Sequence, residues 1–99
     1  MNNVEEFYKA RALLETVKNA TTNRPMVYAY TENEQIVLKL NDDLREYLKE
    51  DKKRYIFTLM ADVIAKSDSE VIKYVIEKLE GNVEYFKTKV IQDFKEKGA

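Results

Sequence analysis

Three carboxylates are the strongest candidates for chemistry in this chain. Asp42, Glu46 and Glu50 recur every four residues, a spacing that would place them on one face of a helix. Carboxylate oxygens grouped in this way can hold Mg²⁺ or Ca²⁺. Arg45 and Lys49 lie among them, however, and opposite charges at helical spacing usually pair with each other on a solvated face. We therefore expect ion pairs here, with no metal site and no cofactor.

Nucleophilic and acid-base catalysis lack their usual side chains. The chain has no cysteine and no histidine, so it has neither a thiolate nor the side chain that titrates near neutral pH. Its only serines are Ser67 and Ser69, and Ser67 forms a helix capping box with Glu70. No glycine-rich phosphate loop is present. The sequence predicts a protein that is not an enzyme and has no catalytic residues.

The charge balance disfavours a nucleic-acid-binding protein. Lys and Arg total 17 and Asp and Glu total 18, so the net charge is -1 and no strong positive field is expected. Residues 31–51 hold seven acids and three bases, an acidic segment that could face a basic partner. Binding of nucleic acid remains an alternative, because a basic run with an adjacent tyrosine and scattered lysines could contact phosphates. These residues are Lys52, Lys53, Arg54, Tyr55, Lys87, Lys89, Lys95 and Lys97.

The length and apolar content fit one domain over residues 1–99. The start is acidic at Glu5 and Glu6, unlike a secretory signal. The most apolar window, residues 55–65, is well short of the ~20 residues that span a bilayer. We expect a cytoplasmic protein with no membrane segment.

One proline and two glycines predict long regular elements. Apolar residues at helical spacing indicate helices over residues 4–18 and 42–66 and a last helix from Asp68, with a polar loop at 19–25. The charged run 49–54 could interrupt the second helix. Asn3 with Glu6 is the capping pair expected for the first helix.

Residues 26–40 fit two periods. Residues 26–30 and 36–40 are rich in β-branched and aromatic side chains and flank a polar loop, which favours a β-hairpin. Alternatively, Thr31 and Glu34 form a capping box that starts a helix at Glu32. The predicted fold class is α+β and mostly helical, with an N-terminal helix, the β-hairpin, then two or three helices that end in a long C-terminal one. An all-α bundle is the alternative.

Tyr28 and Tyr30 are the candidate partner-binding residues, and the loop length decides their surroundings. An odd-length loop would place them on the face of Ile36 and Leu38, in the core, whereas a two- or four-residue loop would place them with Val37 and Lys39. Burial in the core is the favoured interpretation, because strands usually bury their more apolar face.

The C-terminal region carries the most regular apolar pattern. Six residues are separated by 4, 3, 4, 3 and 4 positions, the spacing of an a/d heptad seam. This seam predicts a partner helix, and its β-branched a positions favour a second chain, so we expect a homodimer. Gly81 could instead break the helix and fold it back within the chain. The seam consists of Ile72, Ile76, Leu79, Val83, Phe86 and Val90.

The expected function is that of a small non-enzymatic protein-binding module, regulatory or inhibitory. The usage of Lys, Glu, Asn, Ile and Tyr resembles that of an AT-rich bacterial genome or its phages, where small acidic accessory and inhibitor proteins are frequent. That resemblance is compositional and assigns no residue a role. A nucleic-acid-binding protein is the alternative, and a structural assembly subunit is the second alternative.

Overall fold

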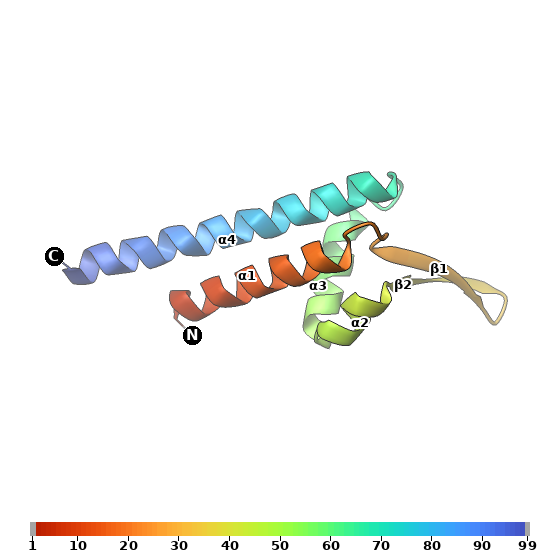
Figure 1. Ribbon diagram of the computed structural model, residues 1–99, viewed down its shortest axis with the longest axis horizontal. Coiled ribbons are helices and arrows are strands. Elements are labelled where there is room, and N and C mark those ends of the chain that lie inside the picture. Colours follow the sequence, from red (N-terminus) through yellow and green to blue (C-terminus); the bar gives the residue numbers. More distant parts are fainter. Residues whose placement is uncertain (1, 99) are drawn as a thin grey trace.

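The computed structural model describes residues 2–98, which form four helices and one β-hairpin (Figure 1). The order along the chain is α1 (Asn3–Ala20), β1 (Val27–Glu32), β2 (Gln35–Leu40), α2 (Asp42–Tyr47), α3 (Glu50–Ala61) and α4 (Asp68–Gly98). The fold class is therefore α+β and mostly helical, as the sequence predicts, and the all-α alternative is wrong.

Helices α1 and α4 lie side by side in opposite directions and form the long axis of the molecule (Figure 1). The overall dimensions are 63 × 23 × 22 Å and the radius of gyration is 16.1 Å, against about 13 Å for a compact chain of this length. The β-hairpin projects from the helical body at the end opposite the C-terminus (Figure 1). The shape is thus a helical rod with an arm.

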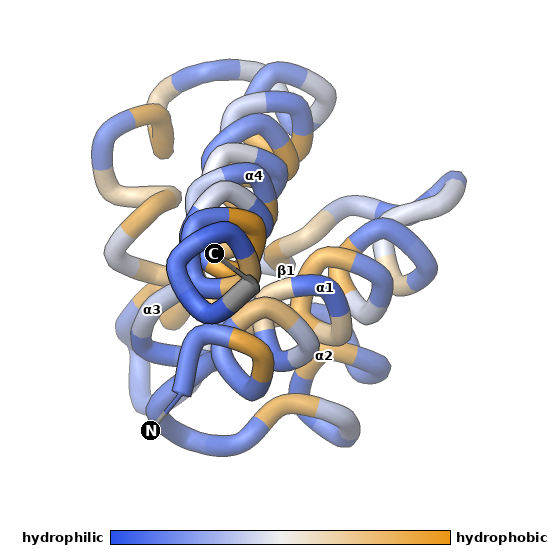
Figure 2. The backbone as a smooth tube through the Cα atoms, turned by 90° about the vertical axis from the view of Figure 1, so that its left-hand side faces the viewer, coloured by the Kyte–Doolittle hydropathy of each residue, from blue (hydrophilic) through white to orange (hydrophobic). Residues whose placement is uncertain are grey.

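The core lies where all the helices and the base of the hairpin meet. Viewed along α4, α1 and α3 lie on different sides of that helix, and the apolar stretches of α4 lie nearest α1 (Figure 2). Burying such side chains stabilises the fold by about 1.5–3 kcal/mol for each large one. The buried apolar residues are Leu13, Leu14, Val17, Ala20, Met26, Leu40, Leu44, Leu48, Ile56, Met60, Val71, Val75 and Leu79.

Helix ends follow local hydrogen bonding, with one shift from expectation. Asn2, not Asn3, caps α1, because its side chain accepts from the Glu5 amide at 2.8 Å. Ser67 caps the start of α4, because its Oγ accepts from the Glu70 amide at 3.4 Å. The Glu70 carboxylate accepts from the Ser67 hydroxyl at 3.0 Å, whereas the predicted capping box would use the Ser67 backbone amide. The expected helix over residues 42–66 is divided, because Leu48 and Lys49 adopt extended backbone between α2 and α3.

Helix α4 runs through Gly81 without a break, which resolves the alternative that the sequence left open. A Cβ added at Gly81 would meet no other part of the chain within 4 Å. We expect Gly81→Ala to raise the free energy of unfolding by about 0.5–1 kcal/mol, because alanine loses less backbone entropy in a helix. Urea unfolding followed by circular dichroism measures this change, and a destabilised variant would contradict a continuous α4.

Candidate interaction surfaces

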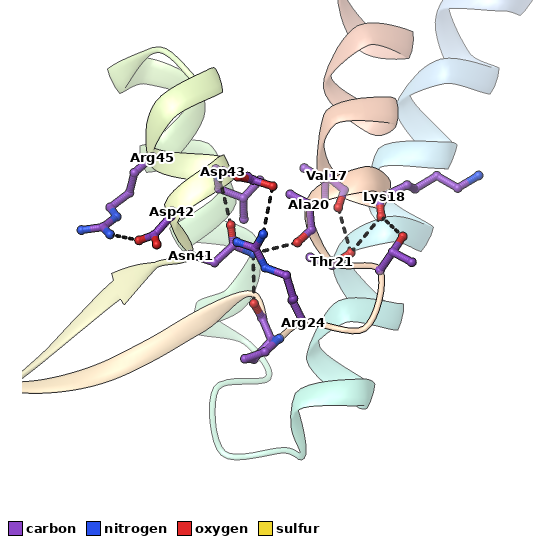
Figure 3. Close-up of polar contacts among 12 residues, drawn as sticks. Val17, Lys18, Ala20, Thr21, Arg24, Asn41, Asp42, Asp43 and Arg45 are labelled. Atoms are coloured by element: carbon purple, nitrogen blue, oxygen red, sulfur yellow. Dashed lines mark hydrogen bonds and ion pairs between the residues drawn. The ribbon is translucent and has the colours of Figure 1, made fainter.

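Asn41 joins the hairpin to the helical body (Figure 3). It is fully buried, and its amide nitrogen donates to the carbonyls of Ala20 and Pro25, each at 3.0 Å. Its side-chain oxygen accepts from the Leu44 amide at 3.0 Å and so caps α2. One side chain therefore connects the end of α1, the start of β1 and the start of α2.

Two further contacts fix the loop between α1 and the hairpin (Figure 3). Thr21 is buried, and its hydroxyl donates to the Val17 carbonyl at 2.8 Å. Arg24 forms an ion pair with Asp43 at 3.0 Å, which links the loop to α2. The base of the hairpin is thereby positioned from both sides.

A two-residue turn sets the register of the hairpin. Asn33 and Glu34 have positive φ angles of 50° and 64°, as a type I′ turn requires. The strands pair from Val27 with Leu40 to Glu32 with Gln35. Asparagine tolerates this conformation well, whereas glutamate at Glu34 adopts it at a cost in backbone strain. The turn forms without glycine, the residue most often found there.

Tyr28 and Tyr30 of the arm lie outside the core. Tyr28 lies opposite Lys39 and Tyr30 opposite Val37, so the expectation that both tyrosines are buried is wrong. Their exposed fractions are 36% and 40%. The physical reason is that the arm projects from the helical body, so both of its faces are open to solvent (Figure 1). The two-residue turn decides which side chains share a face with the tyrosines.

A lysine side chain contacts the face of the arm that carries Tyr28 and Tyr30. The two tyrosine rings lie 6.4 Å apart, and Lys39 Nζ lies 5.3 Å from the centre of the Tyr30 ring. Lys39 also forms an ion pair with Glu32 near the turn. Tyrosine is enriched at protein interfaces and lysine is depleted there, so the two rings are the part of this face that suits a partner.

The opposite face of the arm is apolar and open to solvent. Ile36 is 78% exposed and Leu38 is 43% exposed, with the small side chains of Ala29 and Thr31 opposite them. Only Leu40 and Val27, at the base, contact the core. A two-stranded hairpin with apolar groups on both faces is marginal by itself in water, which favours a partner that covers it.

The seam residues of α4 face α1 of the same chain. Leu79 is 1% exposed, and Ile72, Ile76 and Val83 pack partly buried against the core. Phe86 and Val90 are also partly exposed. Beyond them, at the same spacing, Asp93 accepts a hydrogen bond from Asn3 of α1 at 3.0 Å. Helix α1 of the same chain therefore covers part of the seam, in place of the predicted partner helix, and the rest of the seam stays partly exposed.

Comparisons with protein families, curated proteins and solved structures found no match. The exposed apolar side chains of the arm and of α4 are the candidate interaction surfaces.

The acidic segment is largely paired within the chain. Asp42 pairs with Arg45, and Glu50 pairs with Lys53 at 3.0 Å, while Asp43 is held by Arg24. The three carboxylates that could have shared a helix face do not, because Glu50 begins α3 after the break. Within residues 2–98, no three ligating side chains are grouped for a metal ion.

The basic run is also engaged in structure. Lys53 pairs with Glu50, and the Tyr55 hydroxyl accepts from Asn82 of α4 at 2.6 Å. Lys89 lies 5.5 Å from the centre of the Tyr85 ring. These contacts engage three of the eight candidate phosphate-binding residues, Lys53, Tyr55 and Lys89.

A neighbouring carboxylate keeps the hydroxyl of Tyr74 protonated. Tyr74 Oη donates to Asp62 at 3.0 Å, and this hydrogen bond raises the pKa of Tyr74 above its usual value of 10.0. A raised pKa holds the hydroxyl protonated and makes it a poorer nucleophile at neutral pH.

Of the helices in the part of the chain that is described, none is long and apolar enough to cross a membrane.

Proposed function

We propose that this protein is a small non-enzymatic protein-binding module, regulatory or inhibitory, that contacts its partner through the β1–β2 arm. The observation that supports this most is the arm itself, which exposes Ile36 and Leu38 on one face and Tyr28 and Tyr30 on the other. We place the protein among the accessory proteins of phages and mobile elements, because its amino-acid usage resembles that of AT-rich bacterial genomes and their phages.

The arm suits binding because it is anchored at one end and open at the other. The contacts of Asn41 fix its base, so little orientational freedom is lost when a partner binds. Exposed tyrosines add contact area at low entropic cost, because their side chains have few rotatable bonds. Affinity is then expected to depend on a few arm residues.

We also propose that the binding unit is a homodimer. Large apolar side chains of α1 and α4, among them Tyr8 and Phe94, stay exposed and leave area for a second chain.

The arm is tested with a variant that preserves strand preference. Ile36→Thr combined with Tyr30→Thr removes one large side chain from each face and places threonine, a residue with high strand preference, at both sites. The immobilised wild-type chain is used to capture a stoichiometric protein partner from the source cell, and its affinity is then measured by calorimetry. We expect the double variant to bind about 30-fold more weakly or worse, the effect of losing one interface hot spot.

The matched control is Tyr47→Thr, which removes a tyrosine that is 68% exposed on α2, outside the arm. It should bind as the wild type does. Equal affinity of the arm variant and the wild type would contradict the proposal. Salt-sensitive retention of DNA or RNA with no protein partner would replace it with the nucleic-acid alternative, and assembly into larger particles would favour a structural subunit.

A further inference from the structure

The half of the α1–α4 rod that lies away from the arm has no buried side chain. We name it the distal layer: residues 3–12 of α1 with residues 80–97 of α4. None of these residues is buried, whereas Leu13, Leu14 and Val17 of α1 and Val71, Val75 and Leu79 of α4 are. Two helices cover each other from one direction only, so the apolar side chains of this half are left partly in water.

Four of these apolar residues share the side of the α1–α4 pair that faces away from α3. On α1, Lys9, Leu13 and Thr16 line a cleft of 310 Å³ with Leu48 and Lys52, so this side of α1 faces α2 and α3. Val4 and Tyr8 lie roughly 130° around the helix from it, because each residue turns α1 by about 100°.

The same geometry holds on α4. Tyr74 and Asn82 contact α3 through Asp62 and Tyr55, and Phe94 lies on the far side of α4 from them at about 100° per residue. In the view along α4, α2 and α3 flank one side of the pair, and no helix of residues 2–98 covers the other (Figure 2). We name this uncovered surface the open face, formed by Val4, Tyr8, Ile91 and Phe94.

We infer that the open face of the distal layer binds the same face of a second copy of this chain, so that two α1–α4 pairs pack face to face as a four-helix bundle. The area supports this partner. The chain exposes 7125 Å², about 1,200 Å² more than the roughly 5,900 Å² typical of a monomer of 11.7 kDa. A standard interface covers about 800 Å² on each partner. The projecting arm accounts for part of the excess, and the exposed side chains of the open face account for another part.

The charge of the distal layer also fits a copy of itself. Residues 80–97 contain four acids and four bases, and residues 3–12 contain two of each. Two such surfaces meet without net repulsion, whereas a strongly charged partner such as a nucleic acid would find no complementary field. A face that binds itself across a two-fold axis is the commonest arrangement in oligomers.

This inference gives the interface of the proposed homodimer and moves it from the seam to the open face. The arm lies at the other end of the rod (Figure 1), so both arms stay accessible in the dimer. Dimerisation and arm binding can therefore fail independently of each other.

The test is the mass in solution. We expect light scattering to give twice 11.7 kDa for the wild type at ~100 μM, and the mass of one chain for the variant Tyr8→Lys with Phe94→Lys. These side chains are 62% and 69% exposed, so the variant should keep its helical circular dichroism. Tyr47→Lys, on α2, is the matched control and should remain dimeric.

A wild type that is monomeric at this concentration overturns the inference, whatever the variants do. So does a dimer that the Tyr8 and Phe94 substitutions leave intact. The arm variant Ile36→Thr with Tyr30→Thr should keep the dimer mass, and loss of the dimer in that variant would place self-association in the arm instead.

Discussion

Replacing Asn41 with alanine is expected to lower the free energy of unfolding by about 2–4 kcal/mol. The side chain is fully buried and makes three hydrogen bonds, to Ala20, Pro25 and Leu44. Alanine removes the cap of α2 and leaves two carbonyls without their donor. In a chain of this size the melting temperature should fall by about 10 °C or more.

Thermal and urea unfolding monitored by circular dichroism measure this effect. Asn19→Ala is the matched control, because Asn19 is exposed near the end of α1, and it should change stability by no more than about 0.5 kcal/mol. An Asn41→Ala variant as stable as the control would show that the joint does not hold the arm to the helices.

The second large effect is expected at Leu44. It is the buried residue of the six-residue helix α2 and has no exposed surface. Leu44→Ala should cost about 2–5 kcal/mol, because it removes buried apolar area and leaves a cavity that the short helix fills poorly. The loss should also loosen α2, which the Arg24–Asp43 ion pair connects to the base of the arm.

Tyr47→Ala on the same helix is the control for Leu44, since its side chain is largely exposed. Its expected change is within about 0.5 kcal/mol. The midpoint of urea unfolding separates the two variants, and equal destabilisation by both would mean that α2 is held by surface contacts rather than by Leu44.

The helices and the existence of the hairpin could be predicted from sequence because their signals are local. Apolar spacing indicates α1, α4 and one helix over residues 42–66, which the structure divides into α2 and α3. The helix start at Ser67 is predicted correctly for the same reason, although Glu70 bonds the Ser67 hydroxyl and not its amide.

The surroundings of the arm could not be predicted in this way. The arm projects from the helices, which no local pattern reports (Figure 1). Which side chains share a face depends on whether the turn contains two residues or an odd number, and Asn33 with Glu34 lacks the glycine that signals a two-residue turn. The contacts of Asn41 with Ala20 and Pro25 join residues 21 and 16 positions apart, which no local pattern reports. The seam was visible in sequence, but its partner in α1 was not.

The most direct test of arm binding is amide hydrogen exchange in the wild-type chain, free and bound to the protein partner that it captures. Exchange should slow on binding at Val27–Glu32 and Gln35–Leu40, because a covered strand loses contact with water. The helices beyond the arm should change little. Slowed exchange confined to α1 and α4, with the arm unchanged, would contradict the proposal that this protein binds its partner through the β-hairpin.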